Sequence, residues 1–263
     1  MRIGIAQTSP VFGETERNVA DALEWIGREQ ADLWVLPELF ASGYQFATAR
    51  ECRELSEPVP DGPTSRALIA YATKAGCHIV AGLPERDGDR LYNAAVLVGP
   101  SGFLACYRKV HLFYRETELF ASGDRSFPVV DLGSARVGMM VCFDHLFPES
   151  ARSLALRGAD VIAHPANLVL PDLAQRTMAV RALENGLFTA TANRVGTESR
   201  TDETLVYTGQ SQIVDPGGEI VARLSQTDVG VFVAEVDIAR ARDKAITPFN
   251  DKLADRRPDQ YRL

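Results

Sequence analysis

Three observations predict an α/β fold. Short apolar runs alternate with segments of helical periodicity along most of the 263 residues, which is typical of layered α/β proteins. The composition, 46% hydrophobic and 24% charged, suits one large domain with a sizeable core, and no linker or repeat interrupts residues 1–263. A glutamate, a lysine and a cysteine (Glu38, Lys109 and Cys142) each close a strand-like run. Reactive groups gather at such strand ends in open α/β sheets.

The N-terminal half predicts five strands and two helices. The first strand is expected at residues 2–8, and a helix over 14–30 follows because Val19, Leu23 and Ile26 recur at helical spacing. The other elements of this half are strands at 33–37, 78–84, 91–98 and 103–109 and a helix at 63–74. The last two of these strands are joined by GPSG, which reads as a hairpin turn.

The C-terminal half continues the alternation. Its predicted elements are strands at 137–142, 161–165 and 188–193, helices from about 148 and over 173–186, and late strands on both sides of DPGG at 215–218. The final segment, residues 251–263, is polar and rich in arginine. We expect it to be either a frayed tail or an arm packed on a neighbouring subunit.

The charge balance argues against several classes of partner. A net charge of −7 and a pI near 5.2 do not suit a nucleic-acid or anionic-membrane surface, so a small-molecule partner is expected. The N-terminus lacks the pattern of a secretory leader, and no apolar run approaches the roughly 20 residues of a membrane span. A cytoplasmic location is therefore expected. The four cysteines are irregularly spaced and form no CxxC pair, which argues against a disulfide framework and a structural zinc site.

The three strand-end residues suit nucleophilic chemistry. A free thiol titrates near pH 8.5, so Cys142 needs a neighbouring cation or base to react at neutral pH. Lys109 offers the cation, and Glu38 offers a base that accepts the thiol proton and later activates water. Taken singly, such a cysteine is usually a small core residue and such a charge a solvated loop residue. The combination is what indicates a site.

The local sequences around these residues resemble the nitrilase superfamily, the carbon–nitrogen hydrolases with a Glu-Lys-Cys triad. WVLPELFASGY (34–44), YRKVHLF (107–113) and VGMMVCFDHLFPESAR (137–152) resemble its glutamate, lysine and nucleophile motifs in the family's order. Further similarities lie at residues 93–102, 158–167, 181–196 and 209–222, so the resemblance covers nearly the whole chain. It implies a four-layer αββα sandwich. It also implies that Glu38 is the general base, Lys109 the cation that stabilises the tetrahedral intermediate, and Cys142 the nucleophile.

The family often places a second active-site glutamate shortly after the lysine. Both Glu116 and Glu118 are available here, and the resemblance favours Glu116, which lies seven residues beyond Lys109. In the family that glutamate positions the substrate and the lysine. This chain departs from the common Pro-Gly of the family at residues 122–123, which are Ser-Gly.

Four further residues, Phe143, Asn167, Tyr44 and Tyr114, are candidates for substrate binding. The backbone N–H of Phe143 is expected to hold the developing oxyanion, and the amide of Asn167 to form hydrogen bonds with the substrate, although an asparagine there is as often a cap or turn residue. Tyr44, Phe46 and Tyr114 suggest a small, largely apolar pocket. No metal or cofactor is required by this chemistry. Lys109→Ala is expected to lose turnover while keeping the fold.

The favoured activity is an amidase that releases ammonia from a small aliphatic or aromatic carboxamide through a thioester. The nucleophile segment reads CFD, whereas CWE is common in true nitrilases. A carbamoyl-amine hydrolase or a nitrilase with the same triad is the alternative. The resemblance also implies a homodimer or higher homo-oligomer, built on the helices after Cys142 and His164 and on the C-terminal arm.

Other classes of function stay open. Either His111 or His145 offers a Cys-His dyad with Cys142. A zinc hydrolase would use His111, Asp144, His145 and His164, whose spacing matches no established ligand motif. The third possibility is a catalytically silent scaffold that keeps the fold.

Overall fold

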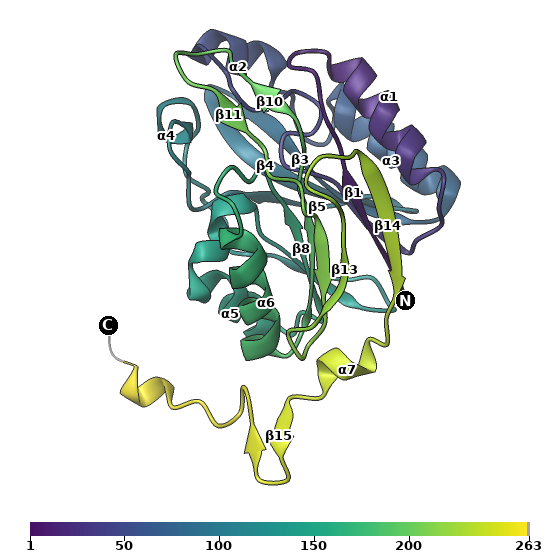
Figure 1. The fold of residues 1–263 in the computed structure, drawn as a ribbon, viewed down its shortest axis with the longest axis vertical. Helices are drawn as coiled ribbons and strands as arrows, with labels where there is room; N and C mark the ends of the chain where they lie inside the picture. Colours follow the sequence, from purple (N-terminus) through teal and green to yellow (C-terminus); the bar gives the residue numbers. More distant parts are fainter. Residues whose placement is uncertain (262–263) are drawn as a thin grey trace.

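The computed structural model describes residues 1–261 and contains two six-stranded sheets that pack face to face, with helices on both outer faces (Figure 1). The α/β class and the four-layer αββα sandwich expected from the sequence are confirmed. One apolar core fills the space between the sheets and takes side chains from both, including Ile5 and Val35 from one and Val137 and Val161 from the other. All four are fully buried. This packing brings the strand ends of the two sheets together.

The first sheet has the order β14-β1-β2-β3-β4-β5. Its strands are β14 (Gly230–Glu235), β1 (Arg2–Gln7), β2 (Leu33–Val35), β3 (His78–Asp87), β4 (Arg90–Gly99) and β5 (Gly102–Arg108). The central strands β1, β2 and β3 are parallel, and antiparallel strands complete both edges. Helices α1 (Thr15–Ile26) and α3 (Pro63–Ala75) cover the outer face, where Ile26 and Leu68 pack near Trp34 in a second core.

The second sheet has the order β13-β12-β9-β8-β7-β6. Its strands are β13 (Ile220–Arg223), β12 (Gln212–Val214), β9 (Phe188–Ala192), β8 (Val161–Pro165), β7 (Arg136–Met139) and β6 (Val129–Asp131). Strands β7, β8 and β9 run parallel. Helices α5 (Pro148–Leu156) and α6 (Leu173–Asn185) cover its outer face through a core that contains Leu154 and Met178.

Several element ends differ from the sequence prediction. Helix α1 ends at Ile26, four residues earlier than expected: Gly27 is its C-cap, and the polar residues 28–30 are exposed and add no apolar side chain to the core. The strand expected at 137–142 ends at Met139, because Cys142 has a φ of 43° and opens a 3₁₀ turn, η1 (Cys142–Leu146). The hairpin at GPSG and the strands around DPGG are confirmed.

Short elements absent from the sequence prediction lie near one end of the sandwich. They are α2 (Ala49–Leu55), α4 (Glu116–Leu119), β10 (Thr197–Glu198) and β11 (Leu205–Val206). Such pieces span too few residues for a hydrophobic period to show. Figure 1 shows them at the end of the molecule opposite the C-terminal arm.

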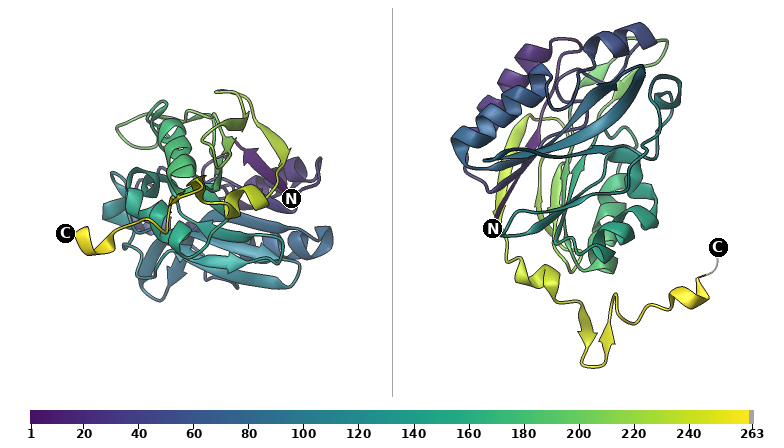
Figure 2. Two further views of the ribbon diagram at one scale, coloured as in Figure 1. Left: turned by 90° about the horizontal axis from the view of Figure 1, so that it is seen from below. Right: turned by 180° about the vertical axis from the view of Figure 1, so that it is seen from behind.

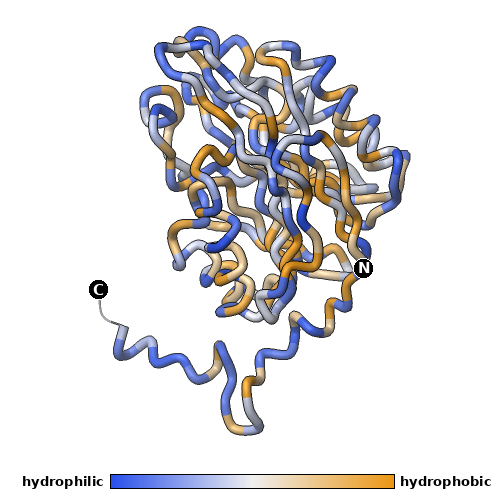
Figure 3. Tube along the Cα trace, in the orientation of Figure 1, coloured by the Kyte–Doolittle hydropathy of each residue, from blue (hydrophilic) through white to orange (hydrophobic). Residues whose placement is uncertain are grey.

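The C-terminal arm, residues 239–261, projects from one end of the sandwich (Figures 1 and 2), while Lys244 and Lys252 bind carbonyl groups near the end of α6. It consists of α7 (Ala239–Arg242), β15 (Ala245–Thr247), β16 (Asn250–Asp251) and η2 (Pro258–Gln260). Figure 3 shows apolar residues concentrated in the sheets and a mostly hydrophilic arm. Phe249, at the hairpin turn, is nevertheless 91% exposed. Within residues 1–261, no helix combines the length and the apolar character needed to cross a bilayer.

Candidate active site

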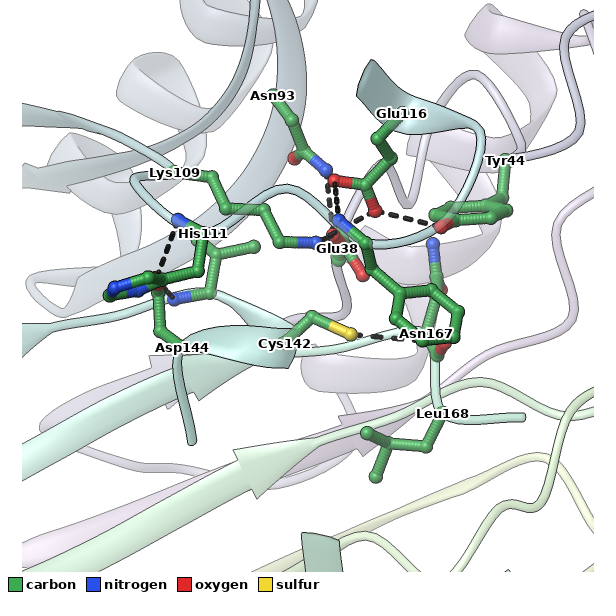
Figure 4. A network of polar contacts seen from close by, with 12 residues as sticks. Glu38, Tyr44, Asn93, Lys109, His111, Glu116, Cys142, Asp144, Asn167 and Leu168 are labelled. Carbon is green, nitrogen blue, oxygen red and sulfur yellow. Dashed lines mark hydrogen bonds and ion pairs between the residues drawn. The ribbon is translucent and has the colours of Figure 1, made fainter. Parts of the chain in front are cut away.

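The side chains of Glu38, Lys109 and Cys142 meet between the two sheets (Figure 4). Glu38 lies just after β2, and Lys109 directly follows β5 of the same sheet. Cys142 begins η1, just beyond β7 of the other sheet. In Figure 4 the sulfur of Cys142 lies on the side of its turn that faces Lys109 and Glu38. The candidate site therefore combines an acid and a cation from one sheet with a thiol from the other.

Lys109 forms two charged hydrogen bonds in a fully buried position. Its Nζ lies 2.8 Å from Oε1 of Glu38 and 2.7 Å from Oε1 of Glu116. Burial alone would lower the pKa of Lys109, but the negative charges of Glu116 and Glu38 outweigh it and raise that pKa above its ordinary value. The side chain is therefore an ammonium ion at neutral pH.

Glu38 keeps one carboxylate oxygen available. Oε1 accepts hydrogen bonds from Lys109 and from Nδ2 of Asn93, the latter at 2.6 Å, whereas Oε2 has no partner within residues 1–261. An unpaired buried carboxylate oxygen is costly. Because Glu38 lies beside Lys109 and Cys142, its free oxygen Oε2 is the candidate acceptor for the thiol proton.

The structure places Glu116, and not Glu118, against Lys109. Oε1 of Glu116 also accepts from the hydroxyl of Tyr44 at 2.7 Å, and Oε2 accepts from the backbone N–H of Phe113 at 3.3 Å. Burial raises the pKa of Glu116, and the charge of Lys109 opposes that shift. The side chain of Glu118 is 61% exposed and pairs with Arg115.

Cys142 occupies a strained and buried position. Its φ of 43° lies in the left-handed region that non-glycine residues rarely adopt. Nε2 of His164 donates to the Cys142 carbonyl at 2.9 Å and so holds the turn. Burial, reinforced by the charge of Glu38, raises the pKa of the Cys142 thiol well above its usual value, although Lys109 acts in the opposite direction. The thiol is therefore neutral at rest and must lose its proton as it reacts.

A small pocket that is partly open to solvent lies beside Cys142. Its walls are mainly apolar and are formed by Phe113, Cys142, Phe143, His145, Asn167, Leu168, Val169, Leu170, Leu173 and Ala174. Asn167 is buried, and neither polar atom of its amide has a partner within residues 1–261. Phe143 and Asn167 thus both line the pocket, as expected for substrate contacts.

The aromatic residues expected in this pocket line an adjacent one instead. Tyr44, Phe46 and Tyr114 line a second pocket that also includes Glu116. The hydroxyl of Tyr114 donates to Glu203, and its side chain is half exposed. Tyr44 contacts Glu116 and so reaches the candidate site indirectly. The apolar walls of the Cys142 pocket come from Phe113, from Phe143 and from five residues that follow Asn167 in the sequence: Leu168, Val169, Leu170, Leu173 and Ala174.

The four residues proposed for a zinc site do not converge on one point: His111 and Asp144 pair with each other, and His145 and His164 have other partners. Nδ1 of His111 lies 2.8 Å from Asp144, and Nδ1 of His145 lies 2.6 Å from the hydroxyl of Thr177. His164 contacts Thr191 and the Cys142 carbonyl. No group of three or more His, Cys, Asp or Glu side chains in the described part of the chain is arranged to hold a metal ion.

No histidine in the described residues forms a hydrogen bond with the sulfur of Cys142, so the geometry does not support a Cys-His dyad. The recorded polar contact of the Cys142 sulfur is with the backbone carbonyl of Asn167 at 3.9 Å. Burial, with Arg181 nearby, lowers the pKa of His145 to about 4, and burial lowers the pKa of His164 to about 3. Both rings are therefore neutral at pH 7 and supply no imidazolium to stabilise a thiolate.

Comparison with known proteins agrees with this geometry. The carbon-nitrogen hydrolase family matches residues 2–245. A protein named as a nitrilase from Pyrococcus abyssi is 48% identical over 264 residues, which cover 99% of each chain. An (R)-stereoselective amidase from a Pseudomonas species is 34% identical over 98% of this chain and 92% of its own length.

Solved structures give the same relationship. A variant of the Nesterenkonia AN1 amidase of the nitrilase superfamily matches with a TM-score of 0.83 and 29% identity, covering 98% of this chain and 95% of that one. Another variant from the same source carries the acetamide moiety of fluoroacetamide on its active-site cysteine; it matches with a TM-score of 0.81 and 27% identity over 98% and 94% of the two chains. This chain therefore belongs to the carbon–nitrogen hydrolase family, the nitrilase superfamily that its motifs resemble, and is a carbon–nitrogen hydrolase.

Proposed function

We propose that this enzyme is a cysteine amidase that converts a small aliphatic or aromatic carboxamide into a carboxylic acid and ammonia. One observation carries the proposal: a buried ammonium held by two carboxylates lies with a buried thiol beside an apolar pocket. The amidases among its relatives and structural neighbours support the same reaction class.

In the first half of the reaction, Glu38 accepts the thiol proton as Cys142 attacks the amide carbonyl. Oε2 of Glu38 suits this role because Lys109 and Asn93 occupy only Oε1. The thiol is neutral at rest, so proton removal and attack must be coupled. Lys109 and the backbone N–H of Phe143 stabilise the oxyanion.

In the second half, the tetrahedral intermediate collapses. Glu38 passes its proton to the departing nitrogen, the C–N bond breaks, and ammonia leaves a thioester on Cys142. Glu38 then removes a proton from water, which attacks the thioester; the C–S bond breaks to release the acid, and Glu38 returns the proton to the sulfur of Cys142. The sum is one amide and one water converted to one acid and one ammonia, with the enzyme unchanged.

Glu116 and Asn167 have supporting roles in this proposal. Glu116 holds the Lys109 ammonium and is itself fixed by Tyr44 and the Phe113 N–H. The unpartnered amide of Asn167 lines the pocket, where it can donate to and accept from a substrate carboxamide. Neither role needs a cofactor.

The lining of the pocket favours uncharged acyl groups. None of its ten lining residues is a lysine or an arginine, and His145 is neutral at pH 7 because burial lowers its pKa to about 4. A substrate carboxylate placed there would lose part of its hydration without gaining a cationic partner. Neutral amides such as propionamide and benzamide are therefore preferred over amides that carry a carboxylate.

A nitrilase is the second candidate, because the relative that is 48% identical carries that name. The same triad would attack a nitrile carbon. A carbamoyl-amine hydrolase is a third use of the triad, and the uncharged pocket disfavours carbamoyl amino acids among its substrates. The three activities are separated by their products.

The test is ammonia release from matched amides, nitriles and carbamoyl amines, with purified wild type, Cys142→Ala and Cys77→Ala. Cys77 is a buried core cysteine away from the site and serves as the matched control. The proposal expects ammonia from neutral amides, a loss of at least about 1,000-fold in Cys142→Ala, and near wild-type turnover in Cys77→Ala. Ammonia from nitriles alone, or activity that survives in Cys142→Ala, would refute it.

We further propose that the chain forms one carbon–nitrogen hydrolase domain over residues 1–263 and assembles as a homodimer. Exposed apolar side chains on the outer helices and on the arm support a second copy as the partner: Leu156 on α5, Val180 and Leu183 on α6, and Ile246 and Phe249 on the arm. Light scattering should give twice the chain mass of 28.8 kDa. A monomer at micromolar concentration would contradict this proposal.

A further inference from the structure

Asp144 links the segment that carries Lys109 to the turn that carries Cys142. Its Oδ2 accepts the hydroxyl of Tyr107 at 2.7 Å and the backbone N–H of Val141 at 2.9 Å. Its Oδ1 accepts both the backbone N–H and Nδ1 of His111, at 3.1 and 2.8 Å. Figure 4 shows the contact between Asp144 and His111 beside Lys109 and Cys142.

The positions of the donors along the chain give this carboxylate its significance. Tyr107 and His111 stand two residues before and two residues after Lys109. Val141 immediately precedes Cys142, and Asp144 itself lies two residues beyond it. One buried carboxylate is thus hydrogen-bonded to residues on both sides of Lys109 and to the residue before Cys142, and it belongs to the turn that follows Cys142.

Such a link is needed because the two residues belong to different sheets. Lys109 follows β5 of the first sheet, and Cys142 follows β7 of the second. No strand pairing fixes their separation. Contacts between the sheets must do so, and a displacement of about 1 Å in a catalytic constellation can cost about 100-fold in rate.

The local structure makes the link rigid. Asp144 is fully buried, and the four donors occupy the roughly four lone-pair positions of a carboxylate. The Tyr107 hydroxyl also accepts the N–H of Val110 at 3.2 Å. The His111 ring stacks on Phe147 at a centroid distance of 3.7 Å.

We propose that Asp144 is a positioning residue that sets the distance between Lys109 and Cys142 by docking the two segments on one carboxylate. Asp144 is not among the residues that line the pocket beside Cys142, so it acts through the two segments that it holds. The proposal rests on the catalytic roles proposed above for Lys109 and Cys142.

The first variant is Asp144→Asn, which keeps the size of the side chain. A carboxamide has one oxygen and one NH₂ group in place of two oxygens. Two of the four groups that donate to Asp144 would then lie against an NH₂ group, which cannot accept their hydrogen bonds. Tyr107→Phe is the second variant and removes only one of the donated hydrogen bonds. Asp160→Asn is the matched control: Asp160 is also a buried carboxylate that accepts a backbone N–H, from Arg136 at 2.9 Å, and an arginine, Arg242 at 3.2 Å, but away from the site.

Two measurements separate positioning from stability. The first is kcat and KM for the best neutral amide, together with the midpoint of chemical unfolding. The second is the pH profile of Cys142 alkylation by iodoacetamide, which needs no turnover. Asp144→Asn should lower kcat by about 100-fold with little change in KM, slow the alkylation and move its profile to higher pH. Tyr107→Phe should have smaller effects on kcat and on the alkylation profile. In the double variant Asp144→Asn/Tyr107→Phe, the fold-loss in kcat should be smaller than the product of the two single fold-losses, because both variants break the same contact.

Asp160→Asn should lower the unfolding midpoint and keep the wild-type kcat and alkylation profile. Wild-type kcat and alkylation in a folded Asp144→Asn protein would overturn the proposal. If that variant does not fold, wild-type values in Tyr107→Phe overturn it equally. Failure of the proposed function would look different, because ammonia would then come from nitriles alone or its release would survive in Cys142→Ala.

Discussion

The ammonium of Lys109 lies 2.7 Å from the carboxylate of Glu116, and the two side chains are 0% and 3% exposed. Glu38 lies 2.8 Å from the same ammonium. Lys109 is therefore held from two directions, and its position depends on both carboxylates. The sequence separation of Lys109 and Glu116, seven residues, is bridged by the loop that leads into α4.

Glu116→Gln should lower kcat by about 10- to 100-fold, since a hydrogen bond to a charged group is worth about 1.5–3 kcal/mol. The lost charge frees Lys109 to move toward Glu38, away from the substrate oxygen. Steady-state ammonia release provides the measurement. Glu118→Gln is the control, because its side chain is 61% exposed and pairs only with Arg115 in the described structure. Equal losses in the two variants would contradict a special role for Glu116.

Lys109→Ala should unfold more easily than the wild type, by about 3–5 kcal/mol, because it leaves two carboxylates buried without their cation. The sequence-based expectation that this variant keeps the fold took no account of that burial. Denaturant titration measures the loss. The double variant Lys109→Ala/Glu116→Gln removes one of the stranded charges, so it should be more stable than Lys109→Ala. A single variant as stable as the wild type would contradict this cost and would mean that the two carboxylates take up a proton or become hydrated.

Gly82→Ala should disturb Glu38 through its backbone. A Cβ at residue 82 would lie 2.5 Å from the Cα of Glu38 and 2.9 Å from the N of Leu39, and neither backbone atom can swing away. Overpacking of this kind costs about 1–3 kcal/mol, and displacement of the base should lower kcat by about 100-fold. Gly230→Ala in β14 of the same sheet is the control, since nothing lies within 4 Å of its added Cβ. Full activity in Gly82→Ala would mean that the position of Glu38 tolerates the shift.

The stability of the fold should decrease as the pH falls from 7 to 5, in part through His145. Burial lowers the pKa of this ring from 6.5 to about 4 in the folded protein, so the unfolded chain binds more protons between these values. Stability from this group is therefore present above about pH 6.5 and is lost as the pH falls toward 4. Wild type should lose about 1–2 kcal/mol more than His145→Gln between pH 7 and pH 5. Glu116 contributes in the opposite direction, because its raised pKa makes the folded protein bind more protons as the pH falls. This contribution is present in both proteins, so it cancels when the wild type is compared with His145→Gln. Parallel stability curves for the two proteins would contradict this assignment.

Leu170→Arg should increase the turnover of amides that carry a carboxylate. Leu170 lines the Cys142 pocket and is 48% exposed, so an arginine there can reach both the solvent and an anionic acyl group. An exposed ion pair is worth up to about 1 kcal/mol, which predicts a gain of about fivefold in kcat/KM for a carboxylate-bearing amide relative to its neutral analogue. Val11→Arg introduces the same charge at an exposed position away from the pocket. The same gain in both variants would mean that net charge, and not the pocket, causes the effect.

Sequence patterns alone determined the order of the main elements, the α/β class and the family. Apolar periodicity located the strands and helices because each is a local consequence of which residues are buried. The apolar pattern predicted that the strand before Cys142 continues to that residue, whereas it ends at Met139. The turn at Cys142 has a φ of 43°, and an apolar pattern carries no information about such a backbone angle. Glu38, Lys109 and Cys142 were found because each stands within a distinctive motif.

Only the tertiary structure decided which other groups meet them. Asn93 reaches Glu38 across 55 residues of sequence, and Asp144 reaches His111 across 33. It also distinguished Glu116 from Glu118, which are two residues apart, by burying the first against Lys109 and leaving the second in solvent. The physical reason is that a local sequence specifies the period and turns of a segment. The pairing of charges and donors from two sheets is set by how those sheets pack.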